Sequence, residues 1–68
     1  MTFGQLIKAA REAQGLSHYD VIEAAGLGSR QYLQTLEKDK AGPSLDTARR
    51  LTVALSLDPA AVMATKRA

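Results

Sequence analysis

The sequence predicts an all-α domain of five short helices packed around one small core. Three features of its 68 residues support this prediction. Apolar residues recur at helical spacing, a polar residue able to cap a helix precedes each apolar segment, and Gly or Pro interrupts the chain between segments. A chain of this length forms one domain, so we expect residues 1–68 to fold as a single unit.

The first helix is predicted over residues 3–14. Thr2 and Gln5 have the spacing of a capping box, in which each side chain bonds a free backbone N–H at the helix start. The apolar positions that follow share one face of the helix: Phe3, Leu6, Ile7 and Ala10. Gly15 is expected to end this helix.

The second and third helices are predicted over residues 18–25 and 29–38. Ser17 and Ser29 are suitable N-caps, and Gly26 suits a left-handed C-cap. Because both helices are short and the turn between them is tight, they must cross steeply. The apolar residues that converge between them are Ile22, Leu27, Leu33 and Leu36. This spacing is typical of a helix-turn-helix formed by helices two and three.

The last two helices are predicted over residues 45–55 and 59–64. Ser44 caps the fourth helix, whose apolar positions are Leu45, Ala48, Leu51, Ala54 and Leu55. Pro59 suits the first turn of the fifth helix, directly after the cap Asp58. Val62 and Met63 are its expected apolar contacts.

Composition excludes several classes of function. With no Cys and one His, the sequence predicts no disulfide, no metal site and no cofactor, and it indicates no small-molecule ligand. Ser17, His18 and Asp20 cannot form a catalytic relay, because helical offsets of one and three point in different directions, so we predict no enzymatic activity. No apolar run approaches the ~20 residues of a membrane span and no export signal is visible, so we expect a cytoplasmic protein without membrane contact.

Polar side chains on residues 29–38 are the candidate functional surface: Arg30, Gln31, Gln34 and Thr35. Arg can donate two hydrogen bonds to guanine, and Gln can pair with adenine. Ser29 can bond a phosphate. The formal net charge of +2 permits a nucleic-acid partner without requiring one. On residue types alone, a merely solvated helix face is an equally good interpretation.

From Phe3 to Val62 the sequence resembles the Cro/CI-type helix-turn-helix family of lambda-repressor-like domains. The matching residues occur in the family's order along the chain. They are Phe3 to Lys8, Arg11, Glu12, Gly15 to Ser17, Val21, Glu23, Gly26, Leu27, Ser29, Arg30, Tyr32, Leu33, Leu36, Glu37, Pro43 to Thr47, Leu51 and Ala54 to Asp58. The resemblance implies a five-helix lambda-repressor-like bundle that lays its third helix in the DNA major groove.

The family resemblance also implies roles for individual residues. Those expected to contact bases are Arg30, Gln31 and Gln34. Those expected at the DNA backbone or the margin are His18, Ser29, Thr35, Lys38 and Lys40. The implied function is sequence-specific binding of duplex DNA by a transcriptional regulator, a repressor-type protein that associates with the nucleoid. The expected assembly is a weak or DNA-assisted homodimer.

Three positions depart from the family pattern. His18 stands where relatives usually carry Gln, and Ile22 where a small Ala is common. The interval from Gly26 to Glu37 is one residue longer than usual. We place the extra residue at Gly28, where it either lengthens the turn or extends the start of the third helix.

Other interpretations remain open at this stage. The same fold can serve as a protein-interaction module of the bridging or anti-repressor type. Four further basic residues are either auxiliary phosphate contacts or solvated side chains: Arg49, Arg50, Lys66 and Arg67. Part of a mainly buried apolar set could also form a self-association patch: Leu51, Leu55, Leu57, Val62 and Met63.

Overall fold

The computed structural model describes residues 1–65, and this part of the chain contains five α-helices. Their bounds are α1 (Phe3–Ala13), α2 (His18–Ala25), α3 (Arg30–Glu37), α4 (Leu45–Ala54) and α5 (Pro59–Met63). The predicted all-α class with five helices is therefore confirmed. None of the helices in residues 1–65 has the length and apolar character needed to cross a membrane.

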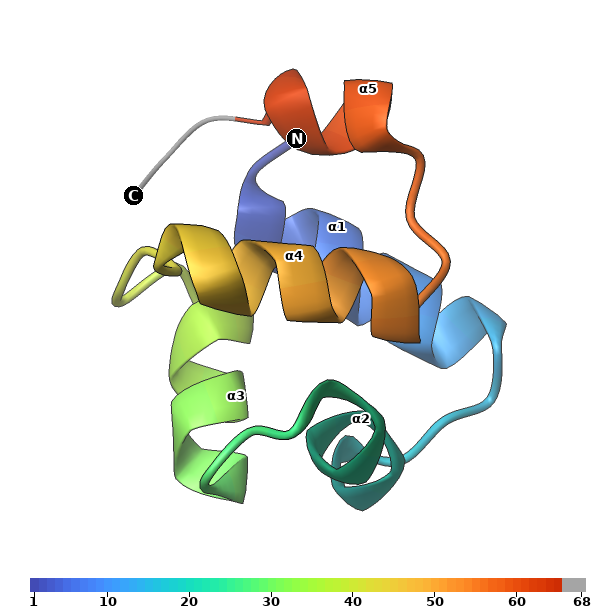
Figure 1. Ribbon diagram of the computed structural model, residues 1–68, viewed down its shortest axis with the longest axis vertical. Helices are drawn as coiled ribbons and strands as arrows, with labels where there is room; N and C mark the ends of the chain where they lie inside the picture. Colours follow the sequence, from blue (N-terminus) through green and yellow to red (C-terminus); the bar gives the residue numbers. More distant parts are fainter. Residues whose placement is uncertain (66–68) are drawn as a thin grey trace.

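A central layer of helices separates the two ends of the molecule (Figure 1). α4 crosses in front of α1 in the middle of the molecule, α2 and α3 make up one end, and α5 lies at the other. α2 packs against both α3 and α4, whereas α1 packs against α3. This arrangement leaves α3 at the edge of the molecule, with one side free of other helices.

Local polar residues define where each helix begins. Thr2 and Gln5 form the capping box of α1, and Ser17 forms a second one with Asp20 at the start of α2. The N-caps of the remaining helices are Ser29, Ser44 and Asp58, each accepting a hydrogen bond from a backbone N–H. The caps expected from the sequence are therefore confirmed. They satisfy donors that the helix itself leaves free.

One core lies between the helices and contains apolar residues from all except α5. Its buried members are Phe3, Ile7, Val21, Ala25, Leu33, Leu36, Leu51, Leu55 and Leu57. Ile22 and Leu27 pack against this core and are partly buried, so the apolar residues of α2 and α3 converge as the spacing predicted.

Two apolar residues predicted to face the core do not. The side chain of Leu45 is 69% exposed and that of Met63 is 87% exposed. Leu45 is the first residue of α4 and Met63 the last of α5. Helical periodicity identified the correct stripe, but at these helix ends the neighbouring helix no longer covers it.

The turn between α2 and α3 is formed by residues 26–29. Gly26 adopts φ 68° and ψ 34°, the left-handed conformation expected of a glycine C-cap. Gly28 lies outside both helices, so the extra residue lengthens the turn and does not extend α3. α3 itself begins one residue later than predicted, at Arg30, with Ser29 as its cap.

Candidate nucleic-acid interface

The outward face of α3 carries the polar residues identified from the sequence. Arg30 and Gln31 are exposed, and Gln34 and Thr35 are half-buried. Thr35 donates its hydroxyl hydrogen to the carbonyl oxygen of Gln31 at 2.9 Å, within the helix. This bond leaves the hydroxyl oxygen of Thr35 able to accept from another donor.

Most of the predicted contact residues line two shallow depressions along α3. One has a volume of about 190 Å³ and is lined by Gln31, Gln34, Thr35, Lys38 and Lys40. The other has a volume of about 310 Å³ and is lined by Lys8, Arg11, His18, Gln34, Glu37 and Lys38. Because Gln34 and Lys38 line both, the two depressions make up one polar surface that runs from α3 to the start of α2.

The predicted residues do not all lie in these depressions. Ser29 and Arg30 lie at the N-terminal end of α3 and line neither depression. The Ser29 side chain accepts a hydrogen bond from the Tyr32 N–H at 3.2 Å, so its oxygen already caps the helix.

Glu37 fixes the C-terminal end of α3 to α1 and α2. Its side chain is only 6% exposed and accepts two hydrogen bonds from Arg11, from Nε at 2.8 Å and from Nη2 at 3.2 Å. His18 Nε2 lies 3.3 Å from Glu37 Oε1. A carboxylate at neutral pH only accepts hydrogen bonds, so Nε2 is the protonated ring nitrogen in this contact. His18 thus links the start of α2 to the C-terminal end of α3.

The same ion pair acts on the guanidinium of Arg11. The hydrogen bond to Glu37 raises the pKa of Arg11 above its ordinary value, outweighing the effect of burial. Arg11 also donates from Nη1 to the carbonyl oxygen of Leu16 at 3.2 Å. A guanidinium held by three bonds and permanently charged keeps the segment before α2 at a fixed distance from α3.

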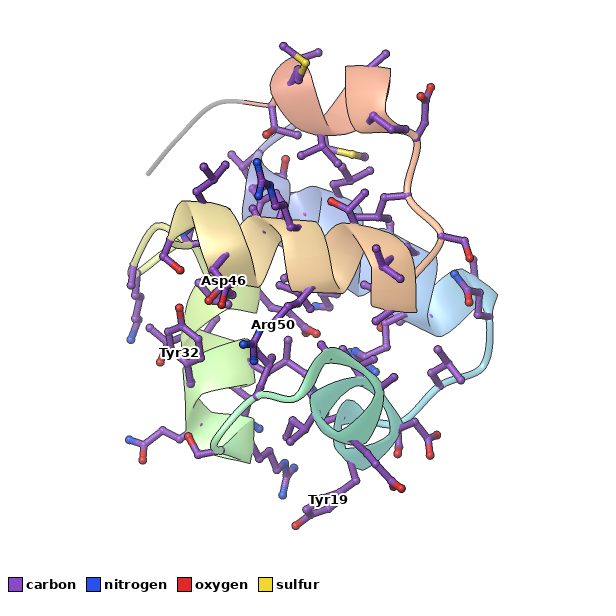
Figure 2. All side chains as sticks on the ribbon, in the orientation of Figure 1. Tyr19, Tyr32, Asp46 and Arg50 are labelled. Atoms are coloured by element: carbon purple, nitrogen blue, oxygen red, sulfur yellow. The ribbon has the colours of Figure 1, made fainter. Side chains whose placement is uncertain are left out.

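Arg50 has a partner of its own, which the sequence did not indicate. Its Nε lies 3.0 Å from Asp46 Oδ2 on the same helix, and its Nη1 donates to the carbonyl oxygen of Gly26 at 3.3 Å. Figure 2 shows Arg50 extending from α4 toward the turn that leads to α3. Arg49 is exposed, and Lys66 and Arg67 lie outside the described residues.

Sequence reasoning missed three residues on or near this surface. Lys8 lines the second depression, Tyr19 projects from α2, and Asp39 follows α3. Asp39 accepts hydrogen bonds from the Thr2 hydroxyl and, at 3.0 Å, from the Gly4 N–H. Only Lys8 could have been found locally, since it lies off the apolar face of its helix. The contacts of Tyr19 and Asp39 depend on how separate helices pack together.

Comparison with known proteins agrees with this geometry. A family model described as a helix-turn-helix domain matches residues 2–64. The immunity repressor protein of Bacillus phage phi105 is 40% identical over 63 residues, which make up 93% of this chain and 43% of that protein. This chain therefore spans less than half the length of that relative.

A solved structure shares the arrangement of the helices. The restriction-modification controller protein C.AhdI from Aeromonas hydrophila matches with a TM-score of 0.79 and 32% sequence identity, over 88% of this chain and 89% of that one. The resemblance inferred from the sequence is thus confirmed by both sequence and structure: the chain belongs to the helix-turn-helix domain family.

Proposed function

We propose that this chain binds duplex DNA with sequence specificity and regulates transcription as a repressor-type protein, with α3 in the major groove. The observation that carries the proposal is the outward face of α3, a helix at the edge of the molecule with Arg and Gln side chains directed away from the core. A major groove admits one helix, and these side chains match the edges of its bases. Such a protein works in the cytoplasm, on the nucleoid.

The residue roles follow from position on this face. Arg30, Gln31 and Gln34 contact bases, because they lie on the outward side of α3. The residues around them meet phosphates or the margin of the site: His18, Ser29, Thr35, Lys38 and Lys40. Lys38 and Lys40 follow the C-terminal end of α3, where a cation can reach the DNA backbone beside the groove.

The names of two relatives support a regulatory role. One is an immunity repressor of a phage and the other a controller protein of a restriction-modification system. The alternative, a protein-interaction module on the same fold, would require an apolar or acidic face on α3. The described face is instead basic and rich in amides.

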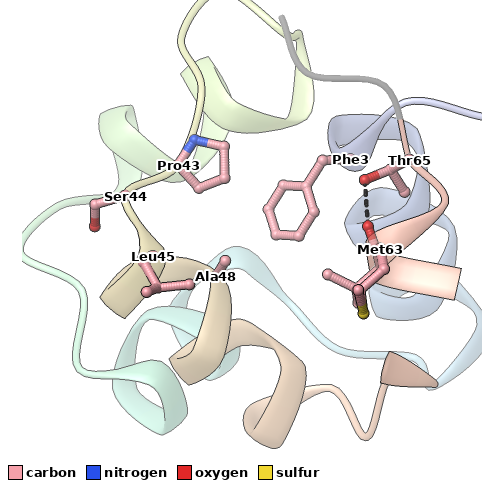
Figure 3. Close-up of a pocket in the computed structure, with 8 residues that line it drawn as sticks. Phe3, Pro43, Ser44, Leu45, Ala48, Met63 and Thr65 are labelled. Atoms are coloured by element: carbon pink, nitrogen blue, oxygen red, sulfur yellow. Dashed lines mark hydrogen bonds between the residues drawn. The ribbon is translucent and has the colours of Figure 1, made fainter. Parts of the chain in front are cut away.

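We further propose that the protein acts as a homodimer, weak in solution and assisted by DNA. An apolar groove of about 220 Å³ supports this proposal (Figure 3). Phe3 lies in the middle of the groove, with Pro43 and Leu45 on one side and Met63 on the other. The apolar set suspected from the sequence is different, because its members Leu51, Leu55 and Leu57 are buried and only Met63 is strongly exposed.

Selection of bound duplexes from a random library with the purified protein tests the proposed function. We expect a palindromic consensus whose half-sites lie about one helical turn apart, because a two-fold dimer presents two copies of α3. A consensus without symmetry would support sequence-specific DNA binding but overturn the proposed dimer. No enrichment at moderate salt would overturn DNA reading and favour the interaction module.

Two substitutions separate base contacts from phosphate contacts. Arg30→Ala should lower the affinity for the selected site by roughly 1–3 kcal/mol and relax the preference at one base pair. Lys40→Ala should instead weaken selected and random duplexes alike and reduce the salt slope by about one. An equal loss on both duplexes for Arg30→Ala would assign Arg30 to the backbone.

A further inference from the structure

Tyr19 is an exposed aromatic residue that the core does not use. It is the second residue of α2, and 66% of its surface is exposed. The other tyrosine, Tyr32, packs against the core. Figure 2 shows Tyr19 projecting from α2 at the end of the molecule where α3 begins. An aromatic ring placed in solvent at this point lies within reach of the start of α3.

The ring of Tyr19 contacts the guanidinium of Arg30. The Cζ atom of Arg30 lies over the ring, 5.7 Å from its centroid. This separation is within the ~6 Å range of a cation–π interaction. Within residues 1–65, Arg30 has no side-chain hydrogen bond or ion pair, so the Tyr19 ring is its only described side-chain restraint of this kind.

A contact through the face of a ring leaves the N–H groups of the guanidinium unbound. Those donors are the groups that a guanine requires, through its O6 and N7 atoms. An ion pair with a carboxylate would engage them instead. The ring can therefore restrict the many rotamers of the arginine side chain before DNA arrives without occupying its hydrogen-bonding edge.

The turn before α3 makes such a restraint useful. Residues 26–29 include two glycines, and the extra residue of this turn sits directly before the cap of α3. Tyr19 comes before this turn in the chain and Arg30 directly after it, so the contact between their side chains links the two helices that the turn joins.

We propose that Tyr19 is a positioning residue for Arg30: its ring holds the guanidinium for base recognition and so determines part of the sequence preference. The proposal rests on the proposed function, since it requires that α3 reads DNA. It assigns no phosphate contact to the tyrosine hydroxyl. Tyr19→Phe keeps the ring and removes the hydroxyl, whereas Tyr19→Leu removes the ring, and both changes are at a site exposed enough to leave the fold intact.

The contact itself can be tested without DNA. In NMR spectra of the free protein, we expect the ring to shift the side-chain resonances of Arg30 upfield, and we expect this shift to persist in Tyr19→Phe and to vanish in Tyr19→Leu. An Arg30 side chain with the same shifts in all three proteins would overturn the proposal, whatever the DNA experiments show.

The effect on recognition is measured as discrimination at one base pair. The dissociation constants are compared for the selected duplex and for a duplex altered at the pair read by Arg30. Tyr19→Leu should lose about two- to fivefold of this discrimination, the size of an exposed cation–π contact, and Tyr19→Phe should match the parent protein. Binding to random duplex should stay the same in all three.

A second background provides the control. In Arg30→Ala, the change Tyr19→Leu should have no further effect on discrimination, because the group that the ring holds is gone. A uniform loss on all duplexes in Tyr19→Phe would identify a hydroxyl–phosphate contact and overturn the proposal. If the parent protein binds no duplex at all, the proposed function fails and this inference fails with it. Normal binding with unchanged discrimination in Tyr19→Leu overturns the inference alone.

Discussion

At the scale of single residues, Gly4 permits a close approach between α1 and the end of α3. A Cβ atom at this position would lie 2.7 Å from the carbonyl oxygen of Glu37 and nearer still to that of Leu36. These are backbone atoms at the end of α3, so they cannot turn aside as a flexible side chain would. The absence of a side chain at Gly4 is therefore what allows α1 to lie directly against the C-terminal end of α3.

Gly4→Ala should lower the free energy of unfolding by about 3 kcal/mol, at the upper end of the range for an overpacked site. The better helix propensity of Ala offsets only about 1 kcal/mol of this loss. Thermal unfolding followed by circular dichroism measures the change. Gly28→Ala is the control, because a Cβ there meets nothing within 4 Å, and its stability should change by less than ~1 kcal/mol. Equal losses in the two variants would contradict the packing argument.

At the scale of elements, the position of α3 depends on different contacts at its two ends. Glu37 binds Arg11 and His18 at the C-terminal end, in a largely buried cluster. The N-terminal end is held by the cap Ser29 and by the contact between Tyr19 and Arg30, both exposed to solvent. The first set contributes mainly to stability, whereas the second set lies among the candidate DNA contacts.

Glu37→Gln should be strongly destabilising. It removes one charge of a pair whose side chains are only 11% and 6% exposed, and leaves the Arg11 charge without its partner. We expect a loss of about 3 kcal/mol, seen as a lower urea midpoint with an unchanged slope. Asp46→Asn makes the same chemical change in the pair with Arg50, whose side chains are 51% and 72% exposed. Because solvent screens that pair, its loss should stay below about 1 kcal/mol.

Ser29→Ala should loosen the start of α3. The variant lacks the oxygen that accepts from the Tyr32 N–H, and loss of such a cap costs about 1 kcal/mol. Hydrogen exchange at the Tyr32 amide reports this opening directly. Ser44→Ala removes the equivalent cap of α4 and should release the Thr47 amide instead. If Ser29→Ala left exchange at Tyr32 unchanged, the cap would not be what holds this end.

At the scale of the whole molecule, α2 and α3 lie at one end and α5 lies at the other (Figure 1). The apolar groove between the start of α4 and α5 contains two exposed large apolar residues, Leu45 and Met63. If a second copy of the chain covers this groove, two protomers can bind neighbouring half-sites together.

Met63→Glu should therefore reduce the affinity for a duplex with two half-sites by roughly tenfold, because a buried charge opposes protomer contact. Affinity for a single half-site should be unchanged. Titrations on the two duplexes measure the difference. Val53→Glu is the control, since Val53 is 80% exposed on α4 and does not line the groove. The same loss in both variants would point to a general effect of charge.

How much of the molecule could be predicted from its sequence depended on the separation between interacting residues. The caps and the apolar stripes follow local rules, so helix starts such as Thr2 and Ser17 were found correctly. The contacts of Glu37 with Arg11 and of Asp39 with Gly4 link residues 26 and 35 positions apart, and no local rule provides them. The exposure of Leu45 was missed for the same reason, because only the assembled fold shows where one helix stops covering another.

The longer turn of residues 26–29 has a consequence for how proteins of this kind could change their targets. Loops tolerate insertions more readily than the helices they join. Here the turn lies beside the N-terminal end of α3, the end proposed to contact DNA, while the opposite end stays anchored through Glu37. If α3 reads DNA as proposed, evolution or a designer could therefore re-aim this helix by altering one loop, with little change in the stability of the scaffold that carries it.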